Sequence, residues 1–259
     1  YCYRCPFGLT AENCAFECAK DIENAILTTT HGKIAALIIE PIMGVGGFID
    51  PPKAYFQEAY AICKKYGGMY ISDEVQAGIG RTGETFFAIE NFGITPDMIS
   101  MAKGLGNGAP IGGVMMKDEI SDSLRGKVHF NTFGGDPYQT LQASLTIDII
   151  KEEGLIENSK TIGNYLKEGF IAMKGKHKSL GDVRGRGLLL GLELVQDKTS
   201  KAYAPEKALQ FMEMSKAKVL LVGKGGLFGN IIRLAPPMTL SKSEADFILK
   251  TTDEILATL

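Results

Sequence analysis

The chain has 259 residues, enough to bury a hydrophobic core in one large domain or in two ordinary ones. Its 28 lysine and arginine residues nearly balance 30 aspartate and glutamate residues, so the charge does not favour a nucleic-acid partner. No apolar run approaches the roughly 20 residues needed to span a bilayer, and the N-terminal residues lack a signal-peptide pattern. We expect neither a nucleic-acid nor a membrane partner, and a cytoplasmic protein, or a mitochondrial one in a eukaryote.

Four of the five cysteines lie near the N-terminus, at Cys2, Cys5, Cys14 and Cys18. Their spacing loosely resembles that of a zinc knuckle. Cys14 and Cys18 are also four residues apart in a helical pattern, so both could instead face a core. The three histidines lack the spacing of metal ligands. We therefore expect no metal site, and zinc at the cysteines remains the alternative.

Apolar runs alternate with amphipathic segments through the first half, which is typical of a mostly parallel sheet flanked by helices. Strands are predicted at residues 33–40, 69–75, 97–102 and 111–116. A helix is predicted to begin near Pro51 or Pro52 and to end at Gly67 and Gly68. Because the strands are continuously hydrophobic, we expect both faces of the sheet to be covered.

The second half predicts a smaller α/β domain with fewer strands. Helices are expected at 138–154, 155–175, 205–218 and 241–259, and strands at 187–195, 219–223 and 231–236. The last helix begins with a capping box formed by Ser241 and Glu244. The predicted domains are residues 1–145 and 146–259.

A glycine-rich loop, GLGNGA at residues 104–109, fits the spacing of a dinucleotide-binding fingerprint. That fingerprint must open a helix, whereas here Pro110 and a predicted strand follow, so the context argues against a nucleotide site. No P-loop motif occurs in the sequence. The loop is instead of interest for Lys103, which directly precedes it.

Asp73 and Lys103 each come at the end of a predicted strand. In an open α/β sheet, ligands bind outside the carboxyl ends of the strands, so these two side chains could face one crevice. A partly buried carboxylate needs a cation or a proton donor as its partner. The spacing alone is equally compatible with a structural ion pair or a helix cap.

Six segments in this order resemble the class III, fold type I, pyridoxal-phosphate aminotransferases: EPIMGVGG, DEVQAGIGRTG, MAKGLGNGAPIG, FNTFGGDP, DVRGRGLLLGLEL and IRLAPPMTL. The resemblance extends from residue 34 to about residue 247. It is strongest to the branch that contains alanine–glyoxylate aminotransferase 2. It implies a partial cofactor-binding large domain followed by the small C-terminal domain of that fold.

By this resemblance, Lys103 forms the Schiff base with pyridoxal 5'-phosphate and moves the proton during transamination. Asp73 pairs with the nitrogen of the cofactor ring, Val75 packs against the ring, and Gln76 hydrogen-bonds near its phenolic oxygen. Thr132 reaches a phosphate oxygen of the cofactor in the neighbouring subunit. The resemblance therefore implies a homodimer with shared active sites.

The resemblance also assigns Arg233 to the substrate carboxylate, which the planar guanidinium can bind through two hydrogen bonds. Glu40 is the family's first glutamate in this region. The second glutamate, which ornithine- and 4-aminobutyrate-type members pair with the arginine, is replaced by Val45. We therefore expect alanine, glyoxylate or pyruvate as substrates. A related ω-amino acid aminotransferase, decarboxylase or aminomutase, or a non-catalytic α/β fragment, are the alternatives.

The family's N-terminal phosphate-binding turn and its ring-stacking aromatic residue have no counterpart in this sequence. The chain therefore resembles a C-terminal fragment of the family. We expect it to be inactive alone and the activity to belong to a longer protein.

Overall fold

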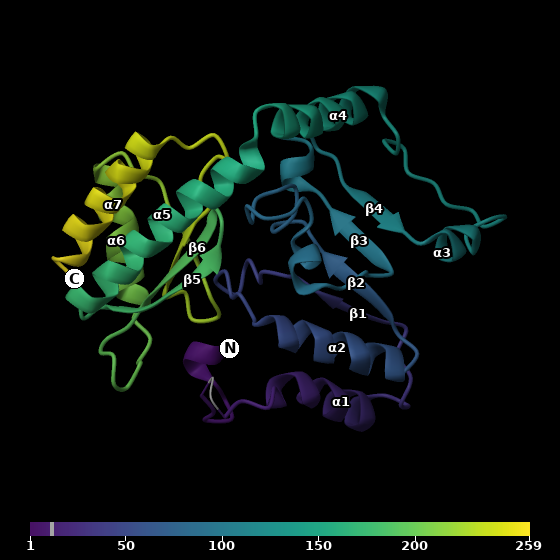
Figure 1. The fold of residues 1–259 in the computed structure, drawn as a ribbon, viewed down its shortest axis with the longest axis horizontal. Helices are drawn as coiled ribbons and strands as arrows, with labels where there is room; N and C mark the ends of the chain where they lie inside the picture. The colour runs from purple at the N-terminus through teal and green to yellow at the C-terminus, as the bar shows by residue number, and fades with distance from the viewer. Residues whose placement is uncertain (11–12) are drawn as a thin grey trace. The chain divides into compact units, whose positions relative to one another are not determined.

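The computed structural model describes residues 1–10 and 13–259 (Figure 1). They form two compact units: unit 1 comprises residues 1–41, 51–79 and 86–153, and unit 2 comprises residues 42–50, 80–85 and 154–259. The division between Glu153 and Gly154 follows the end of a helix, and two loops from the N-terminal part of the chain belong to unit 2. The boundary expected at 145/146 stays a prediction.

Unit 1 is built on a four-stranded sheet with the order β1-β2-β3-β4. The first three strands are parallel and β4 is antiparallel, in agreement with the mostly parallel sheet that the sequence predicts. The elements in chain order are η1 (Cys2–Arg4), α1 (Glu17–Thr29), β1 (Ala36–Ile39), α2 (Lys53–Lys65), β2 (Met69–Asp73), η2 (Ala88–Phe92), β3 (Met98–Met101), η3 (Lys103–Leu105), β4 (Gly113–Met116), α3 (Asp118–Asp122) and α4 (Pro137–Glu152).

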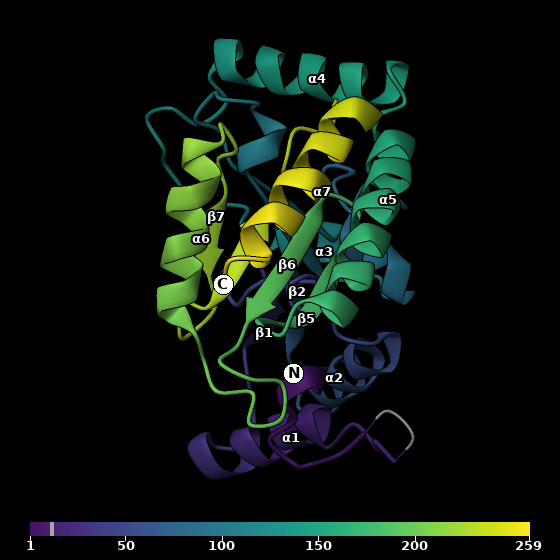
Figure 2. The same ribbon diagram turned by 90° about the vertical axis from the view of Figure 1, so that its left-hand side faces the viewer.

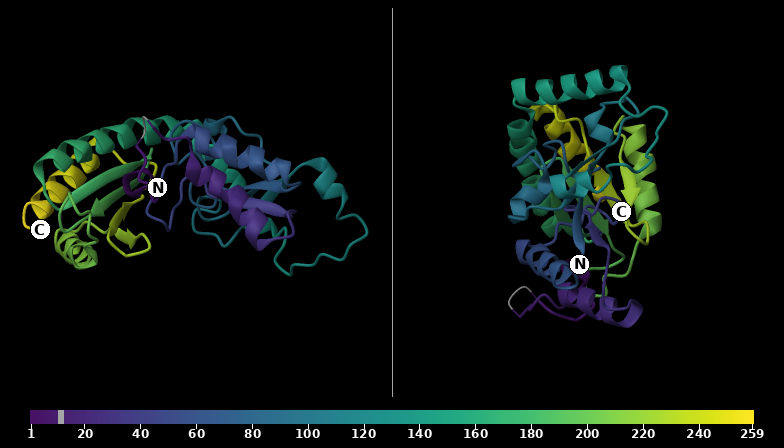
Figure 3. Two further views of the ribbon diagram at one scale, coloured as in Figure 1. Left: turned by 90° about the horizontal axis from the view of Figure 1, so that it is seen from below. Right: turned by 90° about the vertical axis from the view of Figure 1, so that its right-hand side faces the viewer.

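Helix α2 packs on β2 because its apolar residues recur on one face. Phe56, Ala59, Ile62 and Cys63 are all buried, at a spacing that places them along a single stripe. They join Tyr70 of β2 in the core of this unit. Helix α1 lies along α2, as two views show (Figures 1 and 3).

The expectation that both faces of this sheet are covered is wrong for its outer strands. Ile38 of β1 is 58% exposed, and Val114 and Met115 of β4 are 56% and 52% exposed. Both strands lie at the edges of the sheet. A continuous run of apolar residues indicates that both faces of a strand are apolar. It does not indicate that other residues of this chain pack on both faces.

Unit 2 contains a second four-stranded sheet, in the order β5-β6-β8-β7, whose neighbouring strands are all antiparallel. The expectation of fewer strands is therefore wrong. The elements are α5 (Leu155–Lys176), β5 (Leu180–Arg186), β6 (Leu189–Leu194), α6 (Pro205–Ala217), β7 (Gly223–Gly225), β8 (Ile231–Leu234) and α7 (Lys242–Leu256).

Helices α5, α6 and α7 cover one face of this sheet (Figure 2). Leu190, Leu192 and Leu194 of β6 are completely buried and pack with Ile232 of β8 into one core. The predicted capping box is confirmed at α7, where Ser241 Oγ accepts a hydrogen bond from the Glu244 backbone N–H and Glu244 bonds back to the Ser241 backbone.

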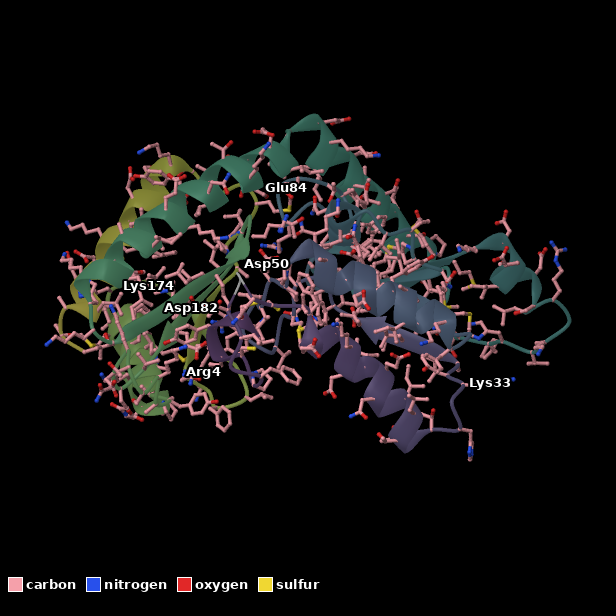
Figure 4. All side chains as sticks on the ribbon, turned by 60° about the horizontal axis from the view of Figure 1, so that its bottom comes forward. Arg4, Lys33, Asp50, Glu84, Lys174 and Asp182 are labelled. Atoms are coloured by element: carbon pink, nitrogen blue, oxygen red, sulfur yellow. The ribbon has the colours of Figure 1, made fainter. Side chains whose placement is uncertain are left out.

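The two N-terminal loops of unit 2 are tied to its sheet by Arg186. The guanidinium of Arg186 pairs with Glu84 at 2.8 Å and with Asp50 at 3.4 Å, and Figure 4 labels both acidic residues. None of the helices described here combines the length and the apolar composition that crossing a membrane would require.

Two elements of unit 2 differ from the sequence prediction. Strand β5 is not predicted by its sequence, LGDVRGR, which is rich in glycine and charge. Of the strand expected at 219–223, only Gly223 belongs to a strand, β7, and Val219 and Leu221 are 86% and 82% exposed. Val219 has a φ of +63°, a left-handed conformation that extended strands do not contain.

Candidate active site

Three predicted site residues lie at one edge of the sheet in unit 1. Glu40 directly follows β1, Asp73 ends β2, and Lys103 comes two residues after β3. The three strands are parallel neighbours, and Asp73 lies opposite Ser100 in the register. Because parallel strands end at the same edge, the fold brings these residues to the edge where ligands bind in open α/β sheets.

Hydrogen bonds orient the half-buried polar side chains at this edge. The Val75 backbone N–H donates to Asp73 Oδ1 over 3.1 Å, and Gln76 Nε2 donates to Glu40 Oε2 over 3.4 Å. Among the described residues, none donates a hydrogen bond to the second carboxylate oxygen of Asp73. That oxygen remains able to accept a hydrogen bond from a ligand.

Glu74 is a further residue at this edge that the motifs did not single out. Its side chain is 1% exposed, and its carboxylate accepts hydrogen bonds from the backbone N–H groups of Ala88 at 2.9 Å and Ile89 at 2.8 Å. Burial raises the pKa of Glu74, although these bonds act in the opposite direction. Glu74 thereby fixes the turn after Asp73 to η2. The signal in the sequence that could have indicated Glu74 is the presence of two consecutive acidic residues after a buried strand.

Lys103 is exposed and has a φ of +45°, which is uncommon for a residue other than glycine. Such strained positions cluster at functional sites. In the loop that follows, a Cβ on Gly106 would lie 2.3 Å from the carbonyl oxygen of Ala109, and Gly108 has a φ of +107°. Gln142 of α4 donates a hydrogen bond of 2.7 Å to the Gly106 carbonyl. The glycines therefore fix the loop after Lys103 tightly.

Thr132 lies in the segment between α3 and α4, in which residues 121–135 are all exposed. Within the described part of the chain, the structure does not bring Thr132 together with the other predicted site residues. Its expected role concerns the cofactor of a second subunit, which a single chain does not test. The assignment of Thr132 stays a prediction.

Arg233 belongs to β8 in unit 2, where its Cζ lies 4.5 Å from the centroid of the Phe48 ring. A Cβ on Gly225 would lie 2.3 Å from Arg233 Cδ and 3.2 Å from the Val45 carbonyl oxygen. Val45 and Arg233 therefore flank the same glycine. Phe48 was not indicated by the motifs, because a single aromatic residue in a loop carries no pattern.

A pocket with a volume of about 550 Å³ adjoins Arg233 in unit 2. Its lining includes Phe48, Leu220 and Phe247 and is mostly apolar, and Arg233 and Glu244 are the charged residues among the described ones that line it. An apolar pocket with a few polar groups is the usual form of a small-molecule site. Arg233 thus contributes a positive charge to the wall of this pocket.

The described residues contain no group of three or more histidine, cysteine, aspartate or glutamate side chains that could hold a metal ion. Helix α1 begins at Glu17, so Cys14 lies outside it, and Cys18 is exposed. The interpretation that Cys14 and Cys18 both face a core from one helix is therefore wrong.

Comparison with known proteins identifies one family. The family described as Aminotransferase class-III matches residues 3–256. The chain is 43% identical over 251 residues to "Alanine--glyoxylate aminotransferase 2 homolog 2, mitochondrial" of Arabidopsis thaliana, covering 97% of this chain and 52% of that protein. It is 37% identical over 257 residues to "Leucine/methionine racemase" of Thermococcus litoralis, covering 99% of this chain and 57% of that protein.

The fold is also shared with solved structures. A thermostable (S)-enantioselective omega-transaminase from Thermomicrobium roseum superimposes with a TM-score of 0.89 at 34% identity, covering 99% of this chain and 58% of that chain. The chain thus spans about half the length of the relatives that it matches.

Proposed function

The chain belongs to the class III aminotransferases, and from this premise we propose that its protein moves amino groups between small α-amino acids and α-keto acids. The observation that supports the proposal most directly is that Asp73 ends β2 and Lys103 follows the adjacent parallel strand β3, at the same edge of the sheet. The proposed fold is the fold type I transferase, with a partial large domain and the small domain.

The family uses pyridoxal 5'-phosphate, and the residues of unit 1 fit this cofactor. Lys103 offers an exposed amine, and Asp73 offers a carboxylate with one oxygen bonded by the Val75 N–H and the other available. When bound, the cofactor supplies a ring that withdraws electrons from the substrate Cα. Asp73 would accept a hydrogen bond from the protonated ring nitrogen, Val75 would pack against the ring, and Gln76 would hydrogen-bond at its phenolic oxygen.

Lys103 is proposed as the covalent attachment point of the cofactor and as the base that takes and returns the proton at the substrate Cα. Its backbone strain and the fixed loop behind it support a defined position for the amine. Thr132 is proposed to bind the cofactor phosphate of a second subunit in a homodimer.

Arg233 is proposed to bind the α-carboxylate of the substrate, and Glu40 is proposed as a second substrate-binding residue. Val45 flanks the same glycine as Arg233 and cannot supply the carboxylate that closes the arginine in terminal-amine aminotransferases. This supports alanine, glyoxylate and pyruvate as substrates over ornithine or 4-aminobutyrate. The activity is proposed for the whole protein, since the chain spans about half of its relatives. This stretch alone is expected to be inactive.

A racemase is the second candidate, because the relative from Thermococcus litoralis carries that name at 37% identity. The same lysine and aspartate serve several reactions of this cofactor, and the outcome depends on the orientation of the bonds around Cα. The remaining alternatives are an ω-amino acid aminotransferase, which would prefer donors with a terminal amine, and a decarboxylase or an aminomutase, which would form products other than those of transamination. The cytoplasm and the mitochondrion remain the proposed locations.

The test is a panel of amino donors and keto acceptors assayed with the whole protein and its Lys103→Ala variant. We expect a yellow wild-type protein that converts L-alanine and glyoxylate to pyruvate and glycine, and no turnover by Lys103→Ala. Borohydride reduction should fix the cofactor on the peptide that contains Lys103. Lys250→Ala, at an exposed lysine of α7, is the matched control and should retain full activity.

A colourless wild-type protein that does not take up pyridoxal 5'-phosphate would contradict the proposal. Highest activity on 4-aminobutyrate or ornithine, with none on alanine, would contradict the argument from Val45. Conversion of L-leucine to D-leucine without transfer of the amino group would favour the racemase.

A further inference from the structure

Arg233 is stacked on an aromatic ring within unit 2. Its guanidinium carbon lies 4.5 Å from the centroid of Phe48, well within the roughly 6 Å over which a cation is attracted to a ring face. Phe48 is 1% exposed, whereas Arg233 is half-buried and lines the pocket. A fully packed ring therefore lies against the guanidinium of an arginine that is half-buried and lines the pocket.

The loop that carries Phe48 is held in place on two sides. The Val45 carbonyl accepts a hydrogen bond of 2.9 Å from the Gly226 N–H, next to β7, and the Gly47 carbonyl accepts one of 3.0 Å from Arg184 Nε on β5. Within the loop, backbone hydrogen bonds pair Met43 with Ile49 in both directions. The backbone on each side of Phe48 is thus fixed to the sheet.

The anchor on β5 is itself buried and paired. Arg184 is 8% exposed, and its Nη1 donates to Glu193 at 2.7 Å and to Asp182 at 3.0 Å. Glu193 is completely buried, so removing its cation would leave an uncompensated charge in the core. This ion-pair group gives Gly47 a donor that cannot easily move.

Two glycines restrict the space around the stack. A Cβ on Gly47 would lie 2.3 Å from Ile231 Cδ1, and Gly47 has a φ of +107°. A Cβ on Gly225 would lie 2.3 Å from Arg233 Cδ, so the stem of Arg233 crosses directly over this glycine. Gly47 thus lets the loop that carries Phe48 pack closely on Ile231, and Gly225 leaves room for the stem of Arg233.

We propose that Phe48 is a specificity-determining residue, whose ring holds the guanidinium of Arg233 in the position that receives an α-carboxylate. The inference rests on the proposed function, since it concerns the carboxylate that Arg233 binds. A guanidinium that is already held in its binding position loses less conformational entropy when the carboxylate binds. Amino donors with a carboxylate therefore gain affinity relative to amines without one. The site would thus select amino acids through Phe48 as well as through Arg233.

The test compares L-alanine with isopropylamine, in which a methyl group replaces the carboxylate of alanine. In the cofactor-loaded whole protein, Phe48→Leu should raise KM for L-alanine by about 2- to 10-fold with little change in kcat. The kinetic constants for isopropylamine should not change. Phe228→Leu is the matched control: Phe228 is a 54% exposed phenylalanine of unit 2 that stacks on Tyr203, and its replacement should leave both donors unaffected.

A second measurement does not depend on activity. Phenylglyoxal modifies accessible arginines, and mass spectrometry of the peptides gives the rate at each one. Phe48→Leu should speed the modification of Arg233 and leave that of Arg125, which is 83% exposed, unchanged. If neither donor reacts with the wild-type protein, the proposed function fails, and this rate still decides whether Phe48 holds Arg233.

An equal loss of kcat/KM for L-alanine and isopropylamine in Phe48→Leu would indicate general damage and overturn the inference. An unchanged ratio of the two donors in an active protein would overturn it as well. An unchanged rate of modification of Arg233 in Phe48→Leu would show that Phe48 does not hold Arg233, and would overturn the inference too.

Discussion

The replacement of Gly163 in α5 by alanine tests a close backbone contact in unit 2. A Cβ at this position would lie 2.3 Å from the carbonyl oxygen and 2.4 Å from the carbonyl carbon of Gly187, in the turn between β5 and β6. Backbone atoms cannot rotate away as a side chain can. Gly187 cannot retreat either, because a Cβ built on it would lie 2.5 Å from the carbonyl oxygen of Arg81.

Two opposing effects determine the size of the change. Alanine is favoured over glycine in a helix by about 1 kcal/mol. Overpacking of a close-packed core costs about 1–3 kcal/mol, and the upper end applies at Gly163 because only a shift of the whole helix relieves the overlap. We therefore expect Gly163→Ala to lower the free energy of unfolding by about 2 kcal/mol.

The same helix supplies the control. A Cβ on Gly175 would meet no described atom within 4 Å, so Gly175→Ala should raise the free energy of unfolding by about 0.5–1 kcal/mol. At Gly169 the obstructing atoms belong to the side chain of Leu249, which can change rotamer, so Gly169→Ala should lie between the two. Urea unfolding followed by circular dichroism measures all three. Equal stability of the Gly163 and Gly175 variants would refute the reasoning.

Two further changes test unit 1 and the core of unit 2. Burial raises the pKa of Asp97, but hydrogen bonds from two lysines and the Tyr70 N–H outweigh it and lower the pKa from 3.8 to about 2. The carboxylate thus contributes about 2 kcal/mol above pH 4 that is lost as the pH falls through 2. Asp97→Asn should lower the free energy of unfolding by that amount at pH 7 and remove its decrease between pH 4 and pH 2. Asp122→Asn, which breaks an exposed ion pair with Arg125, should change neither quantity. An unaltered pH profile of stability in Asp97→Asn would contradict this. Leu192 is completely buried, so Leu192→Ala should lower the free energy of unfolding by about 2–5 kcal/mol in urea. Leu209→Ala, at a half-exposed position of α6, should lower it by less than about 1 kcal/mol. Equal losses in the two variants would contradict the assignment of the core.

Local signals in the sequence predict several elements well. The strand ending at Asp73 has a continuous apolar run, and α7 begins at its capping box. Strand β5 could not be predicted in this way, because Arg184 bonds to the Gly47 carbonyl in a loop that is distant in sequence and to the buried Glu193 of β6. The charge of Arg184 is satisfied by tertiary contacts, which a local pattern does not contain.

The candidate site shows the same limit. Asp73 and Lys103 are expected from motifs and from the geometry of parallel strands, and the strand register brings them to the same edge. Glu74 and Phe48 are not, because their roles depend on the backbone of η2 and on the side chain of Arg233. Phe48 carries no motif of its own, and the pair of acids at Asp73 and Glu74 does not by itself show that Glu74 bonds to η2.

The composition of unit 2 from three separate stretches of chain has a consequence for its synthesis. Residues 42–50 and 80–85 leave the ribosome long before Gly154, at which the main stretch of the unit begins. Until that stretch follows, neither loop has a sheet to pack on, and the buried ring of Phe48 has no core to enter. The unit therefore completes its fold only after the stretch that begins at Gly154 is made, and until then the two loops, with the apolar ring of Phe48, stay exposed on the nascent chain.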